Sequence, residues 1–311
     1  MKICVLGGTG FVGRALIMRL VAAGHHVYVI TRRRERHRDL LVLPTLQLID
    51  GDVHNPVVLR LAFQGMDAVV NLAGILNEPG HDGKGFERVH AGLPGKVVEA
   101  CQSTGVKRLL HMSSLNASLD APSHYLRSKA RGENIVHHAA GGGLAVTSFR
   151  PSVIFGAHDA FTNRFARLLR LTPFIFPLAC ARARLQPVYI NDVVEAFVSA
   201  LNNHQTFGQR FNLCGPRIYT LYELIIYIAE LIAVKRKILP LNDRLSFLQA
   251  AVLEFFPGKP FSLDNYRSLQ RDSVCDAEFP QLFNIHPVSL ETIAPTYLQP
   301  LPHYRAEAKR T

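Results

Sequence analysis

The stretch "VLGGTGFVGRAL", residues 5–16, places three glycines three apart between an apolar run and a helical pattern. A strand–turn–helix that binds a pyrophosphate needs one glycine for the tight turn, one for close backbone approach and one for helix–sheet packing. The start of the helix adds free N–H groups and a positive dipole end. We therefore predict a nucleotide phosphate site; the alternative is a glycine-rich turn without a ligand. The predicted contacts are Gly7, Thr9, Gly10, Phe11, Val12 and Gly13.

Working outward, apolar β-branched runs alternate with helical patterns through the first half of the chain. Strands are expected at 3–6, 27–31, 46–49, 68–72, 108–112 and 146–149, and helices at 12–23, 55–63, 94–104 and 125–139. This alternation predicts an α/β protein with a doubly wound parallel Rossmann sheet that is covered on both faces. We expect the NAD(P)-binding core over residues 1–156. A small C-terminal substrate lobe is expected over 157–311, with returning core elements at about 186–214.

Composition limits the class of protein. With 311 residues that are 48% hydrophobic, the chain can bury one large core, and its net charge of +11 favours an anionic partner such as a nucleotide, a membrane surface or an acidic protein. No nucleic-acid partner is predicted. The five cysteines form no CxxC pair, which favours thiols that serve as small core residues in a reducing compartment. The fourteen histidines lack ligand spacing, so no metal site is predicted.

The N-terminal "MKICVLGG" enters a strand at once, without the pattern of a signal peptide. No apolar run reaches the roughly 18–20 residues that span a bilayer. We expect a cytoplasmic protein, with peripheral attachment to the inner face of the membrane as an alternative.

The segment "TRRRERHR", residues 31–38, carries five arginines where the second strand ends. Sites that prefer NAD have an acid there for the ribose 2′-hydroxyl, whereas arginine suits a 2′-phosphate. Thr31, Arg32 and Arg33 are therefore predicted cofactor contacts, and Arg36 and Arg38 are expected to face solvent. The alternative is that all five arginines only solvate a loop. In "IDGDV" (49–53), we predict that Asp52 reaches the adenine amino group and that Val53 packs on the ring.

Three later motifs predict the reacting end of the site. "NLAG" (71–74) brings Leu72, Ala73 and Gly74 to the top of the fourth strand. "HMSSLNA" (111–117) contributes Met112, Ser113 and Ser114, and "YLRSK" (125–129) puts Tyr125 and Lys129 one helical turn apart. A cationic lysine favours the ionised form of a tyrosine, whose free pKa is about 10. We predict Ser114, Tyr125 and Lys129 as catalytic residues, with Lys129 also holding the nicotinamide ribose. Ser113 could replace Ser114, and the alternative is a cofactor-binding domain without activity.

Together with "RPSVIFG" (150–156), these motifs resemble the short-chain dehydrogenase/reductase superfamily, in its extended or atypical branch. The resemblance places Pro151, Ser152 and Val153 near the nicotinamide. "YLRSKARGE" (125–133) and "LQPVYINDV" (185–193) are similar to the family of nucleotide-binding accessory subunits of mitochondrial complex I and its bacterial relatives, some of them tied to ubiquinone synthesis. That family implies bound NADP(H), with NAD(H) as an alternative, and association with a respiratory membrane complex.

Three functions follow from these patterns. The first is an oxidoreductase for an apolar or quinone-like carbonyl or alcohol, favoured by the apolar "LTPFIFPLAC" (171–180). The second is a non-catalytic, cofactor-bound structural or assembly protein of a respiratory or ubiquinone-synthesis membrane complex. The third, a sugar-nucleotide epimerase/dehydratase, would use the arginines at 164–184 for a second pyrophosphate. Arg164, Arg167 and Arg170 share one helical face, which predicts either a membrane-surface helix or a helix that lines a cleft.

Overall fold

The computed structural model describes residues 1–299, which divide into two compact units. Unit 1 contains Met1–Pro151, Asn191–Leu213 and Pro280–Ile285. Unit 2 contains Ser152–Ile190, Cys214–Phe279 and the chain from His286 onward. Residues 152–156 and 186–190, which the sequence-based division assigned to the core, therefore lie in unit 2. No pattern in the sequence predicted that the chain returns to unit 1 at Pro280–Ile285.

Unit 1 is built on a seven-stranded sheet in the order β11-β6-β5-β4-β1-β2-β3, and every pairing is parallel. The strands are β1 (Lys2–Leu6), β2 (His26–Thr31), β3 (Leu46–Asp50), β4 (Ala68–Asn71), β5 (Arg108–Met112), β6 (Ala145–Pro151) and β11 (Arg210–Leu213). The predicted doubly wound parallel sheet is confirmed. Strand order reverses between β1 and β4, and open parallel sheets bind ligands at such a switch point.

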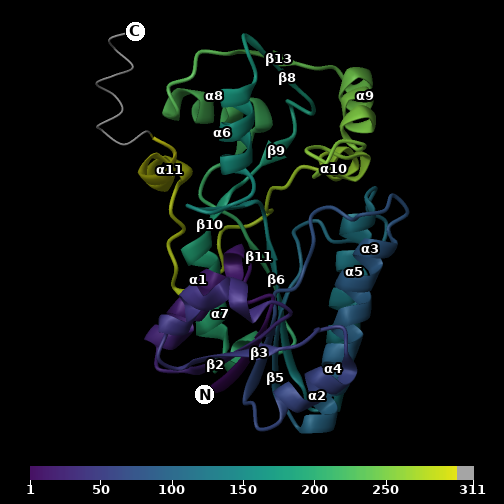
Figure 1. Cartoon of the computed structure of the whole chain (residues 1–311), viewed down its shortest axis with the longest axis vertical. Helices are drawn as coiled ribbons and strands as arrows, with labels where there is room; N and C mark the ends of the chain where they lie inside the picture. The colour runs from purple at the N-terminus through teal and green to yellow at the C-terminus, as the bar shows by residue number, and fades with distance from the viewer. Residues whose placement is uncertain (300–311) are drawn as a thin grey trace. The chain divides into compact units, whose positions relative to one another are not determined.

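Helices cover both faces of this sheet: α2, α4 and α5 lie together on one side, and α1 and α7 on the other (Figure 1). Their bounds are α1 (Phe11–Ala22), α2 (Pro56–Phe63), α4 (Leu93–Thr104), α5 (His124–His138) and α7 (Ile190–Ala200). The short helices are η1 (Arg34–Val42), α3 (Lys84–Glu87), η2 (Arg88–Gly92), η3 (Ala139–Gly142), η4 (His204–Thr206) and η5 (Gln281–Phe283). Local signals set the helix starts: Asn55 caps α2 ahead of Pro56, and Ser123 caps α5. Each strand and helix expected in this unit lies within two residues of its observed bounds.

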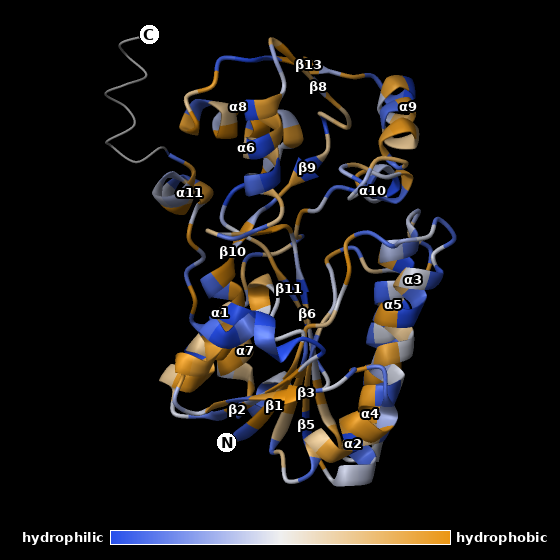
Figure 2. Ribbon diagram, in the orientation of Figure 1, coloured by the Kyte–Doolittle hydropathy of each residue, from blue (hydrophilic) through white to orange (hydrophobic). Residues whose placement is uncertain are grey.

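Unit 2 has its own hydrophobic core, in which α6 and α8 pack with α11 and several two-stranded ribbons. Its helices are α6 (Thr162–Leu171), α8 (Leu221–Leu231), α9 (Asp243–Leu253), α10 (Leu263–Ser268) and α11 (Leu290–Leu298). Its strand pairs are β7 (Ile154–Phe155) with β10 (Val188–Tyr189), β9 (Arg184–Leu185) with β12 (Tyr219–Thr220), and β8 (Ile175–Leu178) with β13 (Lys237–Pro240). A capping box between Thr220 and Glu223 starts α8, which is largely hydrophobic in Figure 2.

The structure limits what the basic helix α6 can do. Leu169 is fully buried, and Phe165 and Leu168 pack against the core of unit 2. These three side chains are therefore used inside the unit and cannot enter a bilayer. The exposed residues of the helix include Arg164, Arg167, Arg170 and its last residue, Leu171. No helix within residues 1–299 combines the length and apolar character needed to cross a membrane.

One expectation about the cysteines is wrong. Cys214 and Cys275 form a disulfide, whereas Cys4, Cys101 and Cys180 are free thiols. The two cysteines meet around Gln186, whose side-chain oxygen accepts from the Cys275 N–H at 3.0 Å and whose amide group donates to the Gly215 carbonyl at 2.7 Å. Because they are 61 positions apart in the sequence, no local spacing could have indicated this pair.

Candidate cofactor and active site

The glycine loop after β1 has the geometry that a phosphate site needs. Gly7 has a φ of +75°, and a Cβ there would lie 2.9 Å from the backbone of Leu72 and Ala73. A Cβ on Gly13 would lie 2.3 Å from the Gly7 carbonyl oxygen, so only glycine lets α1 pack this close. A Cβ on Gly10 would meet only the Gly7 oxygen, at 3.3 Å, and would otherwise point into open space. No side chain caps α1 and its first turn has no acid, so its N–H groups and dipole suit an anion.

The arginine-rich segment lies next to this loop. Arg14 of α1 donates to the Thr9 carbonyl at 3.1 Å, lies 3.1 Å from His37 and forms an ion pair with Asp39, which ties η1 to the loop. Thr31 is buried at the end of β2, and the five arginines that follow it are exposed.

The five arginines differ in their partners. Arg38 forms an ion pair with Glu35, whereas no hydrogen bond or ion pair within residues 1–299 involves the guanidinium groups of Arg32 and Arg33. The pKa of His54 is lowered mainly by burial and further by the positive charges of Arg88, Lys96 and Arg32. Arg32 and Arg33 are therefore available to an external anion.

The remaining predicted cofactor residues line the same edge of the sheet. Asp52 and Val53 follow β3, where Asp52 accepts from the His54 N–H at 3.0 Å and Val53 packs partly against the core. Leu72 and Ala73 follow β4 and are half-buried, while Gly74 is exposed. These residues and the open space at Gly10 fit a nicotinamide dinucleotide.

Tyr125 and Lys129 lie on the first two turns of α5, as their spacing predicts. The Lys129 Nζ is 6.0 Å from the centre of the half-buried Tyr125 ring and donates to the Met112 carbonyl at 3.1 Å. It would lie 3.3 Å from a Cβ on Gly74, so it reaches the tops of both β4 and β5. Burial lowers the pKa of Lys129 to about 8, and the charge of Glu133 partly opposes this shift.

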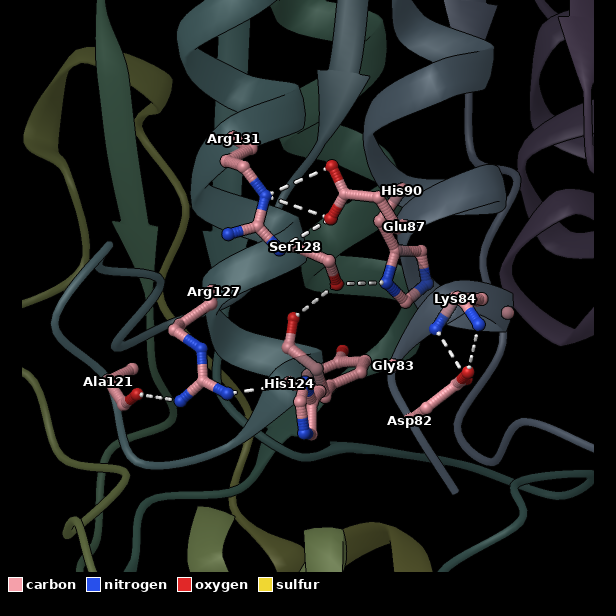
Figure 3. Close-up of polar contacts among 12 residues, drawn as sticks. Asp82, Gly83, Lys84, Glu87, His90, Ala121, His124, Arg127, Ser128 and Arg131 are labelled. Carbon is pink, nitrogen blue, oxygen red and sulfur yellow. Dashed lines mark hydrogen bonds and ion pairs between the residues drawn. The ribbon is translucent and has the colours of Figure 1, made fainter. Parts of the chain in front are cut away.

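His90 is a site residue that sequence reasoning missed. It lies on the π-helical turn η2, is 2% exposed and makes an edge contact with the Tyr125 ring, the ring centres being 5.3 Å apart. Its Nε2 accepts from the Ile75 N–H at 3.1 Å, so in the neutral ring Nδ1 carries the proton and donates to the Ser128 hydroxyl at 2.9 Å (Figure 3). Burial and then Lys129 hold the pKa of His90 far below its ordinary value. A neutral histidine thus helps to position the tyrosine.

An ion pair and a hydrogen bond hold the elements around this histidine together. Arg131 of α5 binds the carboxylate of Glu87, with Nε 3.0 Å from Oε1, and Arg127 donates to the Ala121 carbonyl at 2.7 Å (Figure 3). They join α3 and the loop before α5 to α5 itself. Because Tyr125 lies on the first turn of α5, both contacts help to fix its position.

A buried ion pair lies one further turn along α5. Glu133 is 1% exposed in its side chain and accepts from Arg150 at 2.6 Å and from Arg210 at 2.5 Å. Burial is the largest influence on the pKa of Glu133 and raises it, but the two arginines more than reverse this, so the pKa lies below its ordinary value. The sequence analysis had not singled out any member of this cluster.

The two candidate serines are in different surroundings. Ser113 is 2% exposed and lies near Glu133. Within residues 1–299, its hydroxyl has no hydrogen-bond partner of ordinary geometry, and the same is true of the buried Nε2 of His111. Ser114 is half-buried and donates to the Leu115 carbonyl at 3.2 Å. Its accessibility favours Ser114 over Ser113 as the group that meets a substrate.

Pro151, Ser152 and Val153 fall at the division between the units. Pro151 accepts from the Leu115 N–H at 3.0 Å, next to Ser114. Ser152 and Val153 belong to unit 2, where the Ser152 hydroxyl donates to the Ser273 carbonyl at 2.9 Å and Val153 packs against the core of that unit. Their predicted contact with the nicotinamide stays a prediction. Within residues 1–299, no cluster of three His, Cys, Asp or Glu side chains could hold a metal ion.

The sheet, the glycine loop at its switch point and the Tyr–Lys pair on α5 define a Rossmann-fold protein of the short-chain dehydrogenase class. The model of the NAD dependent epimerase/dehydratase family matches residues 3–214, and the chain belongs to this family.

Several individual proteins are similar in sequence to this chain. The chain is 32% identical over 262 residues to "NADH dehydrogenase [ubiquinone] 1 alpha subcomplex subunit 9, mitochondrial" of Dictyostelium discoideum, which covers 82% of this chain and 71% of that protein. For the Mus musculus protein of the same name the identity is 33%, over 72% of this chain and only 59% of the relative's length. A ceramide reductase of Caulobacter vibrioides is 29% identical over 63% of this chain and 60% of its own.

Solved structures share the fold. Pal from Bacillus thuringiensis superposes with a TM-score of 0.74 at 19% identity, over 96% of this chain and 99% of that chain. The UDP-glucuronic acid 4-epimerase from Bacillus cereus, in complex with UDP-glucuronic acid and NAD, gives a TM-score of 0.70 at 20% identity with the same coverage. At these identities the likeness concerns the fold alone.

Proposed function

We propose that this chain is an NADP(H)-dependent oxidoreductase that acts on an apolar or quinone-like carbonyl or alcohol. The observation that carries the proposal is the buried Lys129, which lies beside the Tyr125 ring and is bonded to the top of β5. Burying a lysine whose pKa is lowered to about 8 is costly for stability, and such shifts cluster at functional sites. A helix with only a structural role would gain no stability from burying this lysine.

The chain's own groups account for the proton and for substrate orientation. A bound nicotinamide supplies the hydride acceptor or donor. The Tyr125 hydroxyl gives a proton to the carbonyl oxygen during reduction, or takes one from the alcohol during oxidation. The Lys129 ammonium stabilises the ionised tyrosine and would hold the nicotinamide ribose. Ser114 donates a hydrogen bond to the same substrate oxygen.

The preference for NADP(H) over NAD(H) is supported by Arg32 and Arg33, which stand where an acid would mark an NAD site and whose guanidinium groups have no partner within residues 1–299. The substrate class is supported by two relatives whose names describe reductases of lipid-like compounds, the ceramide reductase and a Stigmatella aurantiaca ketoreductase of a farnesyl dihydroquinoline oxide. The stretch 171–180 no longer supports it, because Phe176 and Leu178 fill the core of unit 2.

The test is NADPH oxidation with a panel of quinones, prenylated ketones and aromatic aldehydes. Tyr125→Phe should lower kcat by about 10²–10⁴-fold, the usual size of general acid–base catalysis, and leave the NADPH dissociation constant nearly unchanged. Tyr266→Phe is the matched control, since its hydroxyl binds Asp243 in unit 2. If wild type never exceeds Tyr125→Phe with any substrate, the oxidoreductase proposal fails.

The second candidate is a cofactor-bound, non-catalytic protein of a membrane complex. It is favoured by relatives named as subunits of mitochondrial NADH dehydrogenase. It predicts that NADPH raises the melting temperature of the chain while no substrate in the panel is turned over. Stabilisation by NADPH together with Tyr125-dependent turnover would contradict it.

A further inference from the structure

The outer face of the β8–β13 ribbon in unit 2 is apolar and uncovered. The two strands pair in parallel, with Ile175 beside Lys237 and Pro177 beside Leu239. Phe176, Leu178 and Ile238 point into the core of the unit. The alternate residues face outward, with Ile175 50% and Leu239 45% exposed. The outward face of the ribbon thus carries the apolar Ile175, Pro177 and Leu239 beside the cation Lys237, and the core of the unit uses only the inner face.

The end of α6 and the turn before β8 extend this surface. Leu171 is 69% exposed and Phe174 is 83% exposed. Phe174 has a φ of +53°, and the Ile175 N–H donates to the Pro173 carbonyl at 2.7 Å, which closes a γ-turn around it. A bulky side chain in this region is strained, and such strain persists where function requires it. Here the strained turn leaves the phenyl ring exposed. The ribbon near the β8 and β13 labels includes hydrophobic segments (Figure 2).

Cations flank the apolar surface. Arg167 and Arg170 lie on the exposed face of α6, and Lys235 and Lys237 lie at the start of β13. None of these four has an ion-pair partner within residues 1–299. The guanidinium Nε of Arg236 donates to the Thr172 carbonyl at 2.6 Å, which links the two segments. Neither 160–191 nor 231–242 contains an acid; the exposed acids Glu230, on the last turn of α8, and Asp243, at the start of α9, flank the second segment.

This combination selects one kind of partner. A second copy of the chain would bring like charges together. A nucleic acid would satisfy the cations but leave Leu171, Ile175 and Leu239 in contact with charged groups. An interface of anionic lipid matches both parts, because acyl chains and glycerol accept the apolar residues while the headgroup phosphates meet the arginines and lysines.

We propose that the β8–β13 tip, defined as Leu171, Phe174, Ile175 and Leu239 with the cations Arg167, Arg170, Lys235 and Lys237, docks on the surface of a bilayer that contains anionic lipid. Phe174 and Leu171 enter the interface, and the cations lie at the level of the phosphates. Docking does not depend on turnover at Tyr125.

The absence of tryptophan from the chain makes a direct test possible. Phe174→Trp introduces a single fluorophore at the tip, and Phe255→Trp introduces one at a residue of equal exposure, 82% against 83%, that follows Glu254 elsewhere in unit 2. With vesicles of phosphatidylcholine and phosphatidylglycerol at low salt, the emission of Phe174→Trp should shift to the blue and be quenched by brominated acyl chains. The emission of Phe255→Trp should not change.

Flotation of the full chain with the same vesicles measures affinity. The double variant Leu171→Ser, Phe174→Ser should weaken binding at least about tenfold, since it removes two interfacial apolar side chains. Phe255→Ser should stay within about twofold of wild type. Binding should fall with vesicles of phosphatidylcholine alone and at about 1 M salt, where the Debye length is about 3 Å. No flotation of wild type at low salt, or equal emission shifts at 174 and 255, would overturn the proposal.

Discussion

Two groups of arginines in unit 1 have the same chemistry and opposite surroundings. Arg150 and Arg210 come from neighbouring strands, and both bind the buried carboxylate of Glu133. Arg32 and Arg33 follow β2, are exposed and bind no acid within the described part of the chain. Folding brings the Glu133 carboxylate to Arg150 and Arg210. No acidic side chain within residues 1–299 pairs with Arg32 or Arg33.

The difference separates stabilising charges from binding charges. A buried carboxylate is costly unless its partners are in place, so removing one member leaves an uncompensated charge. An exposed guanidinium is solvated by water, so it costs the folded state little free energy when no ligand is bound. We therefore expect substitutions in the Glu133 cluster to lower stability, and substitutions of Arg32 and Arg33 to lower affinity for a phosphate.

The largest effect should come from Glu133→Ala. It leaves Arg150 and Arg210 without their shared partner, and we expect a loss of about 3 kcal/mol in the free energy of unfolding. This is the lower end of the range for buried pairs, because the two arginine side chains are 29% and 35% exposed. Urea unfolding followed by circular dichroism measures it. A loss below about 1 kcal/mol would mean that the cluster is not a source of stability.

The next effect should come from the double variant Arg32→Ala, Arg33→Ala. Hydrogen bonds to charged groups are worth about 1.5–3 kcal/mol, so the NADPH dissociation constant should rise about 10–100-fold. The NADH dissociation constant and the free energy of unfolding should hardly change. Calorimetry with both cofactors measures this, and Arg36→Ala is the matched control. Equal affinity of wild type for NADPH and NADH would contradict the proposal that Arg32 and Arg33 bind a phosphate.

A smaller, pH-dependent effect should come from Lys129, the buried cation near Glu133. Its pKa is about 8 in the folded chain and about 10.4 when unfolded, so between these values the unfolded state binds more protons. The stability of wild type should therefore rise across this window by at most about 1.4 kcal/mol per pH unit. Lys129→Met lacks this component, so its stability relative to wild type should be highest below pH about 8 and decrease towards pH about 10.

Urea unfolding of wild type and Lys129→Met at several pH values gives that difference, in which the other titrating groups cancel. The exposed Lys107 provides the control, since Lys107→Met should show no such trend. A stability difference between wild type and Lys129→Met that is independent of pH would show that the folded lysine titrates normally.

The smallest effect should come from Glu35→Gln, which breaks the ion pair with Arg38. Both side chains are largely exposed, at 69% and 75%. Exposed pairs contribute about 0–1 kcal/mol, so the free energy of unfolding should change by less than about 0.5 kcal/mol. Thermal unfolding at low and high salt measures it. A larger loss would mean that pairing matters for exposed arginines as well, and would weaken the contrast drawn above.

Much of unit 1 could be predicted from the sequence because its signals are local. The apolar runs, the cap at Ser123 and the glycine spacing at 7, 10 and 13 depend on residues only a few positions apart. The Tyr125–Lys129 pair is likewise set by the pitch of one helix. These features placed the sheet, its helices and the residues of the candidate site.

Other features appeared only in the folded chain. Glu133 lies 17 residues from Arg150 along the chain, His90 meets Ser128 across 38 residues, and Cys214 meets Cys275 across 61. The core-facing role of Phe176 and the outward position of Phe174 also depended on how unit 2 packs. Periodicity, capping and turn chemistry act within about one helical turn and so can be read from the sequence. Which distant side chains meet is decided by how the helices and strands pack together, and that only the tertiary structure determines.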